Sequence, residues 1–215
     1  MEHEISFIAA IRLTACIAAT AAFMMLGSGG TAQAEPAKSQ PGRHGTPAVP
    51  KNAAQKTRIL ADLYERLAAS ENAESAEPLA AAIEQMWLYS GSETVNVLME
   101  RSLDALRRED PTLALRLLDG IVSYQPTYAE GWNRRAYVHF TQKDYTQALV
   151  DLQRVLSLDP RHFKALNGVA TIMREIGQKG AALKAYRKLL DIHPHWSDAQ
   201  QAVKELEREV EGENI

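Results

Sequence analysis

Apolar and small residues recur every 34 positions through the second half of this 215-residue chain. Seven columns keep one chemical class through three copies: Pro126, Pro160 and Pro194; Ala114, Ala148 and Ala182; Leu98, Trp132 and Leu166; Ser102, Ala136 and Ala170; Leu115, Leu149 and Leu183; Leu118, Leu152 and Tyr186; Ile121, Val155 and Leu189. A fixed period of this length is the signature of a repeat architecture, in which each copy is one supersecondary unit. The pattern predicts three consecutive units.

Each unit contains two stretches with helical periodicity. Trp132 and Ala136 are four residues apart on one face of a first helix, and Ala148, Leu152 and Val155 follow the i, i+4, i+7 spacing of a second. The small residue in the alanine column lets the paired helices approach closely, and the proline column ends the second helix because proline lacks the backbone N–H. We therefore expect antiparallel helix pairs.

The junction between the two helices of the first unit carries a further signal. Asp110 is followed directly by Pro111. An aspartate side chain accepts hydrogen bonds from the free N–H groups of a helix start, and proline suits the first helical position. The sequence predicts that the second helix of this unit begins at Pro111.

These residues resemble the tetratricopeptide repeat family, and the middle unit carries the likeness best. It reads Trp132, Arg135-Ala136 and His139, then Ala148, Leu152 and Pro160, where Arg135 and His139 replace the family's usual Leu and Tyr. The resemblance covers Val95 to Trp196. It implies an all-α fold, a right-handed α-solenoid of antiparallel helix pairs, and a protein or peptide partner.

The register divides the chain into segments. The three units span 95–128, 129–162 and 163–196. Upstream, apolar residues at helical spacing in 57–69 and 78–89 predict a helix pair, so that 53–94 forms a degenerate repeat or N-terminal capping helices. Downstream, 197–215 reads as a polar C-terminal capping helix and tail, because a terminal unit needs a polar outer face.

The N-terminus has the pattern of an export signal. Leu13 to Gly30 is uncharged and apolar, and Ala32 and Ala34 fit the small-residue rule for signal-peptidase cleavage. We expect 1–34 to be a signal peptide cleaved after Ala34, which indicates a bacterial periplasmic protein with no membrane insertion after cleavage. Residues 35–52 hold four prolines and two glycines and read as a flexible leader.

Two alternatives stay open for this segment. The uncharged stretch is long enough to span a bilayer, so an uncleaved anchor would make the chain a membrane-tethered scaffold. Leu13-Thr14-Ala15-Cys16 also resembles a lipobox, although its strongest apolar run follows the cysteine rather than preceding it.

Composition narrows the possible partners. The formal net charge is −3, too close to neutral for a phosphate-binding surface, so nucleic acid is not an expected partner. Cys16 is the only cysteine, and cleavage would leave a mature chain without a thiol, a disulfide or a cysteine metal ligand.

No nucleotide-binding or hydrolase motif occurs in the sequence, and no cofactor is expected. The cluster His193-Pro194-His195-Trp196, with His162 one repeat earlier, is the best candidate for a metal-binding protein or an enzyme accessory. A metal site needs at least three placed ligands, however, and no carboxylate or cysteine stands at a suitable spacing. The histidines are therefore interpreted as inter-repeat turn residues and no metal site is predicted.

The candidate binding surface is the face of the first helices that the family typically presents on its concave side. The resemblance places these residues there: Met99, Leu103, Leu106, Asn133, Tyr137, Phe140, Thr141, Lys164, Asn167, Thr171 and Arg174. The set runs from apolar to polar and basic, which would suit a peptide or helix with an apolar end and an acidic end. The sequence thus predicts a non-catalytic adaptor in the cell envelope.

One class within the family is not favoured. Chaperone-binding tetratricopeptide domains clamp a C-terminal carboxylate with Lys and Asn side chains on successive first helices. The matching positions here hold Met99, Leu103 and Arg134, and only Lys164 agrees.

Overall fold

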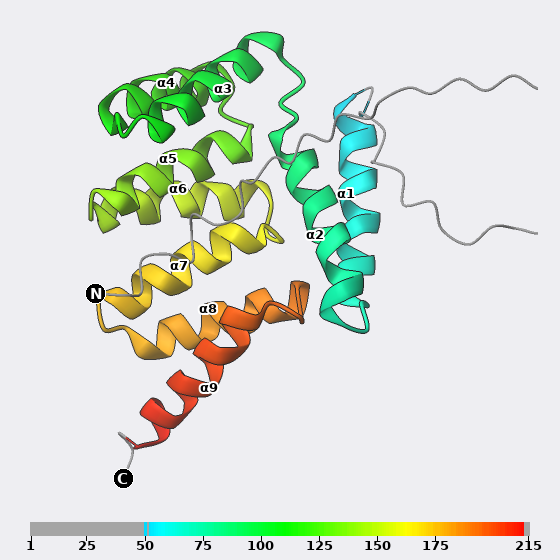
Figure 1. Cartoon of the computed structure of the whole chain (residues 1–215), viewed down its shortest axis with the longest axis vertical. Helices are drawn as coiled ribbons and strands as arrows, with labels where there is room; N and C mark the ends of the chain where they lie inside the picture. The colour runs from blue at the N-terminus through cyan, green and yellow to red at the C-terminus, as the bar shows by residue number, and fades with distance from the viewer. Residues whose placement is uncertain (1–49, 51, 213–215) are drawn as a thin grey trace, which may run out of the picture. The chain divides into compact units, whose positions relative to one another are not determined.

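The computed structural model describes residues 50 and 52–212. Within this range the chain forms α-helices and no strand, which confirms the all-α class (Figure 1). The helices are α1 (Ala53–Ala68), α2 (Ala73–Leu88), α3 (Glu93–Arg107), α4 (Pro111–Tyr124), α5 (Ala129–Thr141), α6 (Tyr145–Leu158), α7 (Phe163–Glu175), α8 (Lys179–Ile192) and α9 (Ser197–Gly212). The pairs α3–α4, α5–α6 and α7–α8 correspond to the three predicted units.

The turn inside each pair repeats in the same register. Glu109, Lys143 and Gly177 have φ values of 57°, 60° and 75°, so each turn passes through the left-handed region, which only glycine adopts without strain. Asp110 follows the first of these turns, and its side chain accepts the Leu113 N–H at 2.9 Å, which confirms that α4 begins at Pro111.

The packing columns are buried as the period predicts. Ala114, Ala148 and Ala182 are each 0 % exposed, as are the three residues of the last column, Ile121, Val155 and Leu189. The alanines allow the two helices of a pair to approach closely, because a larger side chain at a fully buried position would overpack the contact.

Consecutive pairs stack through the first helix of the later pair, so that α5, α7 and α9 pack on α4, α6 and α8. On α7 this contact buries Ala165 and Ile172, and on α9 it buries Ala199 and Leu206, the same two columns one period later. Therefore α9 takes the position of a first helix in a further unit. In α3 the first of these two columns holds Val97, which is 46 % exposed.

The second column holds Asp104 in α3, whose side chain is 42 % exposed. Asp104 thus places a charge where α7 and α9 bury an apolar side chain, and Val97 is left exposed. Among the residues that the structure describes, no upstream helix packs on this face of α3 as α6 packs on α7. The stack of helix pairs therefore begins at α3.

The two upstream helices form a hairpin whose second helix starts earlier than the sequence indicates. The apolar pattern predicts a start at Pro78, but α2 begins at Ala73. Asn72 accepts the Ser75 N–H at 2.9 Å and Ser75 Oγ accepts the Asn72 N–H at 3.3 Å, a reciprocal cap that extends the helix through the proline. Pro78 is the sixth residue of α2, past the first turn, and it has no N–H to donate to the Glu74 carbonyl.

The hairpin of α1 and α2 does not stack in front of α3. It lies beside the ends of the later helices, and its main contacts outside the hairpin are from α1 to α8 and from α2 to α5 (Figure 1). Leu63, Leu67 and Ile83 of the hairpin share one hydrophobic cluster with Phe163 and Leu189. This pair is therefore joined to the stack across the inter-unit turns.

None of the helices in the described part of the chain combines the length and the apolar character needed to cross a membrane. The predicted signal peptide at 1–34 and all of the leader except Pro50 and Asn52 lie outside the described residues.

Candidate interaction surface

The structure divides the residues predicted for α3 by exposure. Met99 is only 5 % exposed and packs in the core of its unit with Val95 and Leu118, so it is not available to a partner. Leu103 and Leu106 are partly buried against the same core and keep part of their side chains at the surface. The first unit therefore contributes two of its three predicted residues.

On α5, Tyr137 and Phe140 are also partly exposed. Phe140 packs against Tyr145 with ring centroids 5.8 Å apart, which fixes the ring at the junction of α5 and α6. Thr141 is exposed and donates to the Val138 carbonyl at 2.7 Å. Asn133 lies one turn before Tyr137 and is committed to an internal contact, since its Nδ2 donates to Glu130 at 3.0 Å.

On α7 the polar residues meet the flanking helices. Lys164 Nζ lies 2.6 Å from Glu84 of α2, and Arg174 Nη2 lies 3.4 Å from Glu205 of α9. Asn167 and Thr171 stand between them with intermediate exposure. The basic end of the predicted surface is therefore already paired with carboxylates of this chain.

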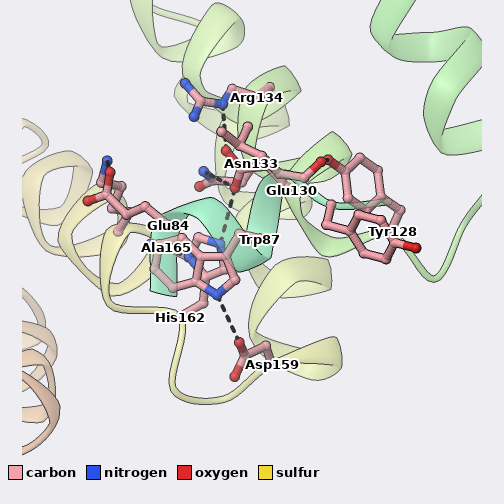
Figure 2. Close-up of polar contacts among 12 residues, drawn as sticks. Glu84, Trp87, Tyr128, Glu130, Asn133, Arg134, Asp159, His162 and Ala165 are labelled. Carbon is pink, nitrogen blue, oxygen red and sulfur yellow. Dashed lines mark hydrogen bonds and ion pairs between the residues drawn. The ribbon is translucent and has the colours of Figure 1, made fainter. Parts of the chain in front are cut away.

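A buried polar network lies next to this surface and was missed by the sequence analysis (Figure 2). Its centre is Glu130, 2 % exposed, whose carboxylate accepts from Arg134 Nε at 2.5 Å and from Asn133. Oε2, the oxygen that accepts from Asn133, also lies 3.3 Å from His162 Nε2. Burial alone would raise the pKa of Glu130, but the Arg134 charge and the His162 contact outweigh it and lower that pKa to about 2.

His162 connects this network to a helix start. The residue is 0 % exposed, and its Nδ1 accepts the Ala165 N–H at 3.2 Å as the N-cap of α7. An accepting Nδ1 carries no proton, so the hydrogen-bond pattern assigns the ring proton to Nε2, which donates to Glu130. The imidazole thus joins α5 to the first turn of α7.

The other face of His162 belongs to the hairpin. Trp87 of α2 stacks on the imidazole with ring centroids 3.7 Å apart, and its Nε1 points toward Asp159, 3.3 Å away (Figure 2). The same Nε1 donates to Tyr64 Oη at 3.0 Å. Tyr64 Oη donates in turn to Asp159 at 2.6 Å. Burial and the neighbouring Asp159 raise the pKa of Tyr64 well above its usual value, so the phenol stays a donor.

Further contacts hold the two ends of the hairpin. His195 Nε2 lies 2.7 Å from the Ser70 carbonyl in the α1–α2 turn. Lys56 Nζ donates to the Tyr89 carbonyl at 2.6 Å, and burial lowers the pKa of this lysine to about 8. Tyr128 Oη donates to the Leu88 carbonyl at 3.0 Å.

The histidine cluster considered as a metal site has a packing role in the structure. His193 is 9 % exposed and meets Phe163 and Trp196 edge to face, with centroids 5.6 and 5.4 Å away. His193 therefore packs within the stack, and His195 contacts the hairpin through the Ser70 carbonyl. In the described part of the chain no group of three or more His, Cys, Asp or Glu residues could hold a metal ion.

The buried polar groups can stabilise the junction of hairpin and stack, because each buried charge has a partner. One sequence signal could have located them. Tyr128, His162 and Trp196 occupy one column, 34 residues apart, in which every member is an aromatic ring with a polar atom.

Comparison with known proteins finds the same repeat and a relative of similar sequence. The family model described as Tetratricopeptide repeat matches residues 129–162. A TPR repeat-containing protein of Rhizobium etli is 36 % identical over 153 residues, which cover 71 % of this chain and 75 % of that protein.

Two solved structures show the same fold at low identity. The first TPR of Spaghetti (RPAP3) bound to the HSP90 peptide SRMEEVD has a TM-score of 0.53 and 18 % identity, covering 55 % of this chain and 94 % of that one. MamA has a TM-score of 0.52 and 19 % identity, covering 76 % of this chain and 87 % of its own. The matched repeat and the relative of similar length together show that this chain belongs to the tetratricopeptide repeat family.

Proposed function

We propose that this chain is a non-catalytic interaction module that binds a peptide or helix of a partner protein along its first helices. The observation that carries the proposal is the partial exposure of four apolar residues in two repeat columns: Leu103, Leu106, Tyr137 and Phe140. Leu103 and Tyr137 are one period apart, as are Leu106 and Phe140, so neighbouring units present the same columns. Clustered aromatic and aliphatic side chains of this kind are suitable anchors for a partner.

The family relation supports binding as the general role. The first TPR of Spaghetti (RPAP3), which has the same fold, is bound to the HSP90 peptide SRMEEVD, so the architecture can accept a peptide. Fold alone does not identify a partner, because one fold hosts many functions. The partner of this chain is therefore proposed from its own surface.

A photocrosslinking experiment in the native organism tests the surface. Tyr137 is replaced by p-benzoylphenylalanine, and the matched control carries the same residue at Val150, which is 54 % exposed on the second helix α6. We expect a discrete adduct from position 137 and none from 150, and Leu103→Asp should remove it. Equal adducts from both positions would show that binding is not confined to the first helices.

We also propose that the protein acts in the bacterial periplasm after removal of residues 1–34. The proposal rests on the apolar stretch from Leu13 and the small residues at Ala32 and Ala34. Cell fractionation with N-terminal sequencing should find a soluble chain starting at Glu35. An intact chain in the membrane fraction would instead support the tethered scaffold.

A further inference from the structure

One stripe of α7 carries a cation at each end. Lys164, Asn167, Thr171 and Arg174 follow spacings of three, four and three residues, which place them along one side of the helix. The exposed fractions of the lysine and arginine side chains are 37 % and 51 %. A surface of this kind, two accessible cations flanking two polar side chains, would suit the carboxylates of an acidic peptide.

Each of these cations already has a carboxylate partner, and each partner comes from a different flanking element. Glu84 of α2 lies 2.6 Å from Lys164, and Glu205 of α9 lies 3.4 Å from Arg174. The two glutamates are themselves 38 % and 36 % exposed, so a molecule approaching the stripe meets their negative charge as well.

A cation of the neighbouring first helix is also paired, in this case with a carboxylate of its own helix. Arg134 of α5 is held by the buried carboxylate of Glu130 at 2.5 Å, and only 29 % of its side chain is exposed. The three cations that α5 and α7 bring to this region are therefore each neutralised by the chain itself. The leucine side chains of α3, Leu103 and Leu106, carry no charge and are only partly buried, so this pairing does not affect them.

We propose that Glu84 and Glu205 are specificity-determining residues that exclude acidic peptide ends from this surface. The partner then binds through an apolar segment of its own, which contacts the apolar residues of α3 and α5. The physical basis is that an incoming carboxylate is repelled by the two glutamates and must replace them as the partner of each cation. This inference rests on the proposed function and specifies its partner class. It also replaces the expectation of a partner with an acidic end.

The test measures binding of a fluorescent SRMEEVD peptide, the acidic peptide that the related RPAP3 domain binds, to the full chain by polarisation. The double variant Glu84→Gln, Glu205→Gln keeps the side-chain size and removes both charges. A surface charge contact changes an equilibrium constant roughly two- to fivefold, so the double variant should bind about four- to twenty-five-fold more tightly than the wild type. The gain should largely disappear at about 0.5 M salt, because exposed charges are then screened.

Two controls isolate the effect. Glu207→Gln removes the same charge from α9 at a residue that pairs with Arg187 of α8 at 2.7 Å, and this variant should bind the peptide as weakly as the wild type. Adding Lys164→Ala and Arg174→Ala to the double variant should abolish the gain. Circular dichroism melting curves should coincide for all the variants within a few degrees, since the altered pairs are exposed.

A double variant that binds the peptide no more tightly than the wild type would overturn the proposal. This outcome is independent of the photocrosslinking at Tyr137. If the adduct fails but the peptide series behaves as described, the site on α3 and α5 is wrong while the exclusion of acidic ends stands. If the adduct forms at position 137 but the double variant gains no affinity for the peptide, the apolar site on α3 and α5 stands and the exclusion of acidic ends by Glu84 and Glu205 is wrong.

Discussion

The indole of Trp87 lies parallel to the imidazole of His162, with ring centroids 3.7 Å apart and an angle of 9° between the planes. Trp87 comes from the hairpin, whereas His162 caps α7 in the stack and contacts Glu130 of α5. A single stacked pair therefore joins three elements. The contact is fully enclosed, since the exposed fractions of the two residues are 4 % and 0 %.

We predict that Trp87→Ala destabilises the protein by about 3–5 kcal/mol, the usual cost of truncating a buried aromatic residue. The variant loses the stack and the Nε1 hydrogen bonds to Tyr64 and Asp159. Urea unfolding followed by circular dichroism measures the change. The matched control is Leu88→Ala at the next position, 40 % exposed, which should cost less than about 1 kcal/mol. Equal unfolding midpoints for the two variants would show that the hairpin is held by other contacts.

Glu130 should make stability depend on pH in the acid range. Its pKa is about 2 in the folded protein, against the 4.5 of an ordinary glutamate in the unfolded chain, so the folded state favours the carboxylate. The resulting stabilisation is present above pH 4.5 and is lost as the pH falls toward 2. Removing one partner of a buried ion pair is costly, so Glu130→Gln should lose about 3 kcal/mol at neutral pH.

The difference between wild type and Glu130→Gln should shrink steadily between pH 4.5 and pH 2. Urea unfolding at half-unit pH steps across this range measures it. A difference that stays constant with pH would mean that Glu130 does not hold its charge in the folded state.

His193 should cause a second pH dependence at higher pH. Burial, followed by the nearby His195, lowers the pKa of His193 below its ordinary 6.5, so the folded state favours the neutral ring. The stabilisation is present above pH 6.5 and is lost as the pH falls below that value. We predict that His193→Phe, which keeps a ring against Phe163 and Trp196, flattens the melting temperature between pH 7 and pH 5. A slope unchanged by this substitution would assign the effect to another group.

Two helical glycines should respond oppositely to alanine. A Cβ on Gly131 of α5 would lie 2.8 Å from Ile121 Cγ2 and 3.3 Å from Tyr128 Cδ1, so the contact between α4 and α5 would have to open. A Cβ on Gly120 of α4 would meet nothing within 4 Å. Gly120→Ala should stabilise the protein by up to about 1 kcal/mol through helix propensity, and Gly131→Ala should destabilise it by about 1–3 kcal/mol. Thermal melting of both variants checks the sign, and a stabilising Gly131→Ala would contradict the close approach of α4 and α5.

Much of the repeat region could be predicted from the sequence, because its contacts recur at a fixed separation. The columns of Ala148 and Val155 are buried in every unit, and the turn at Asp110 and Pro111 forms where the residue types require it. Trp132 marks the limit of this reasoning. It occupies a core column by register but is only partly buried, with Nε1 donating to the Pro126 carbonyl and Arg135 stacked 4.8 Å from its ring.

The candidate surface could be predicted only in part. The period identified Leu103, Leu106, Tyr137 and Phe140 as one set of columns, and the structure leaves all four partly exposed. Met99 was placed in the same set by register, although the register alone cannot tell which side of α3 has no neighbour. The ion pairs of the basic residues could not be predicted from the register, since Glu84 stands 80 positions before Lys164 and no period relates them.

The sequence by itself determined the repeat register, the helix pairs and the family, because these depend on side chains that meet within one unit or between adjacent units. Only the tertiary structure decided where the α1–α2 hairpin lies and what surrounds the proposed binding surface. Tyr64 and Asp159, whose hydrogen bond helps to attach the hairpin, are 95 residues apart. Such a contact depends on the packing of the whole stack rather than on local periodicity, and it is this packing that brings Glu84 to the cation of α7.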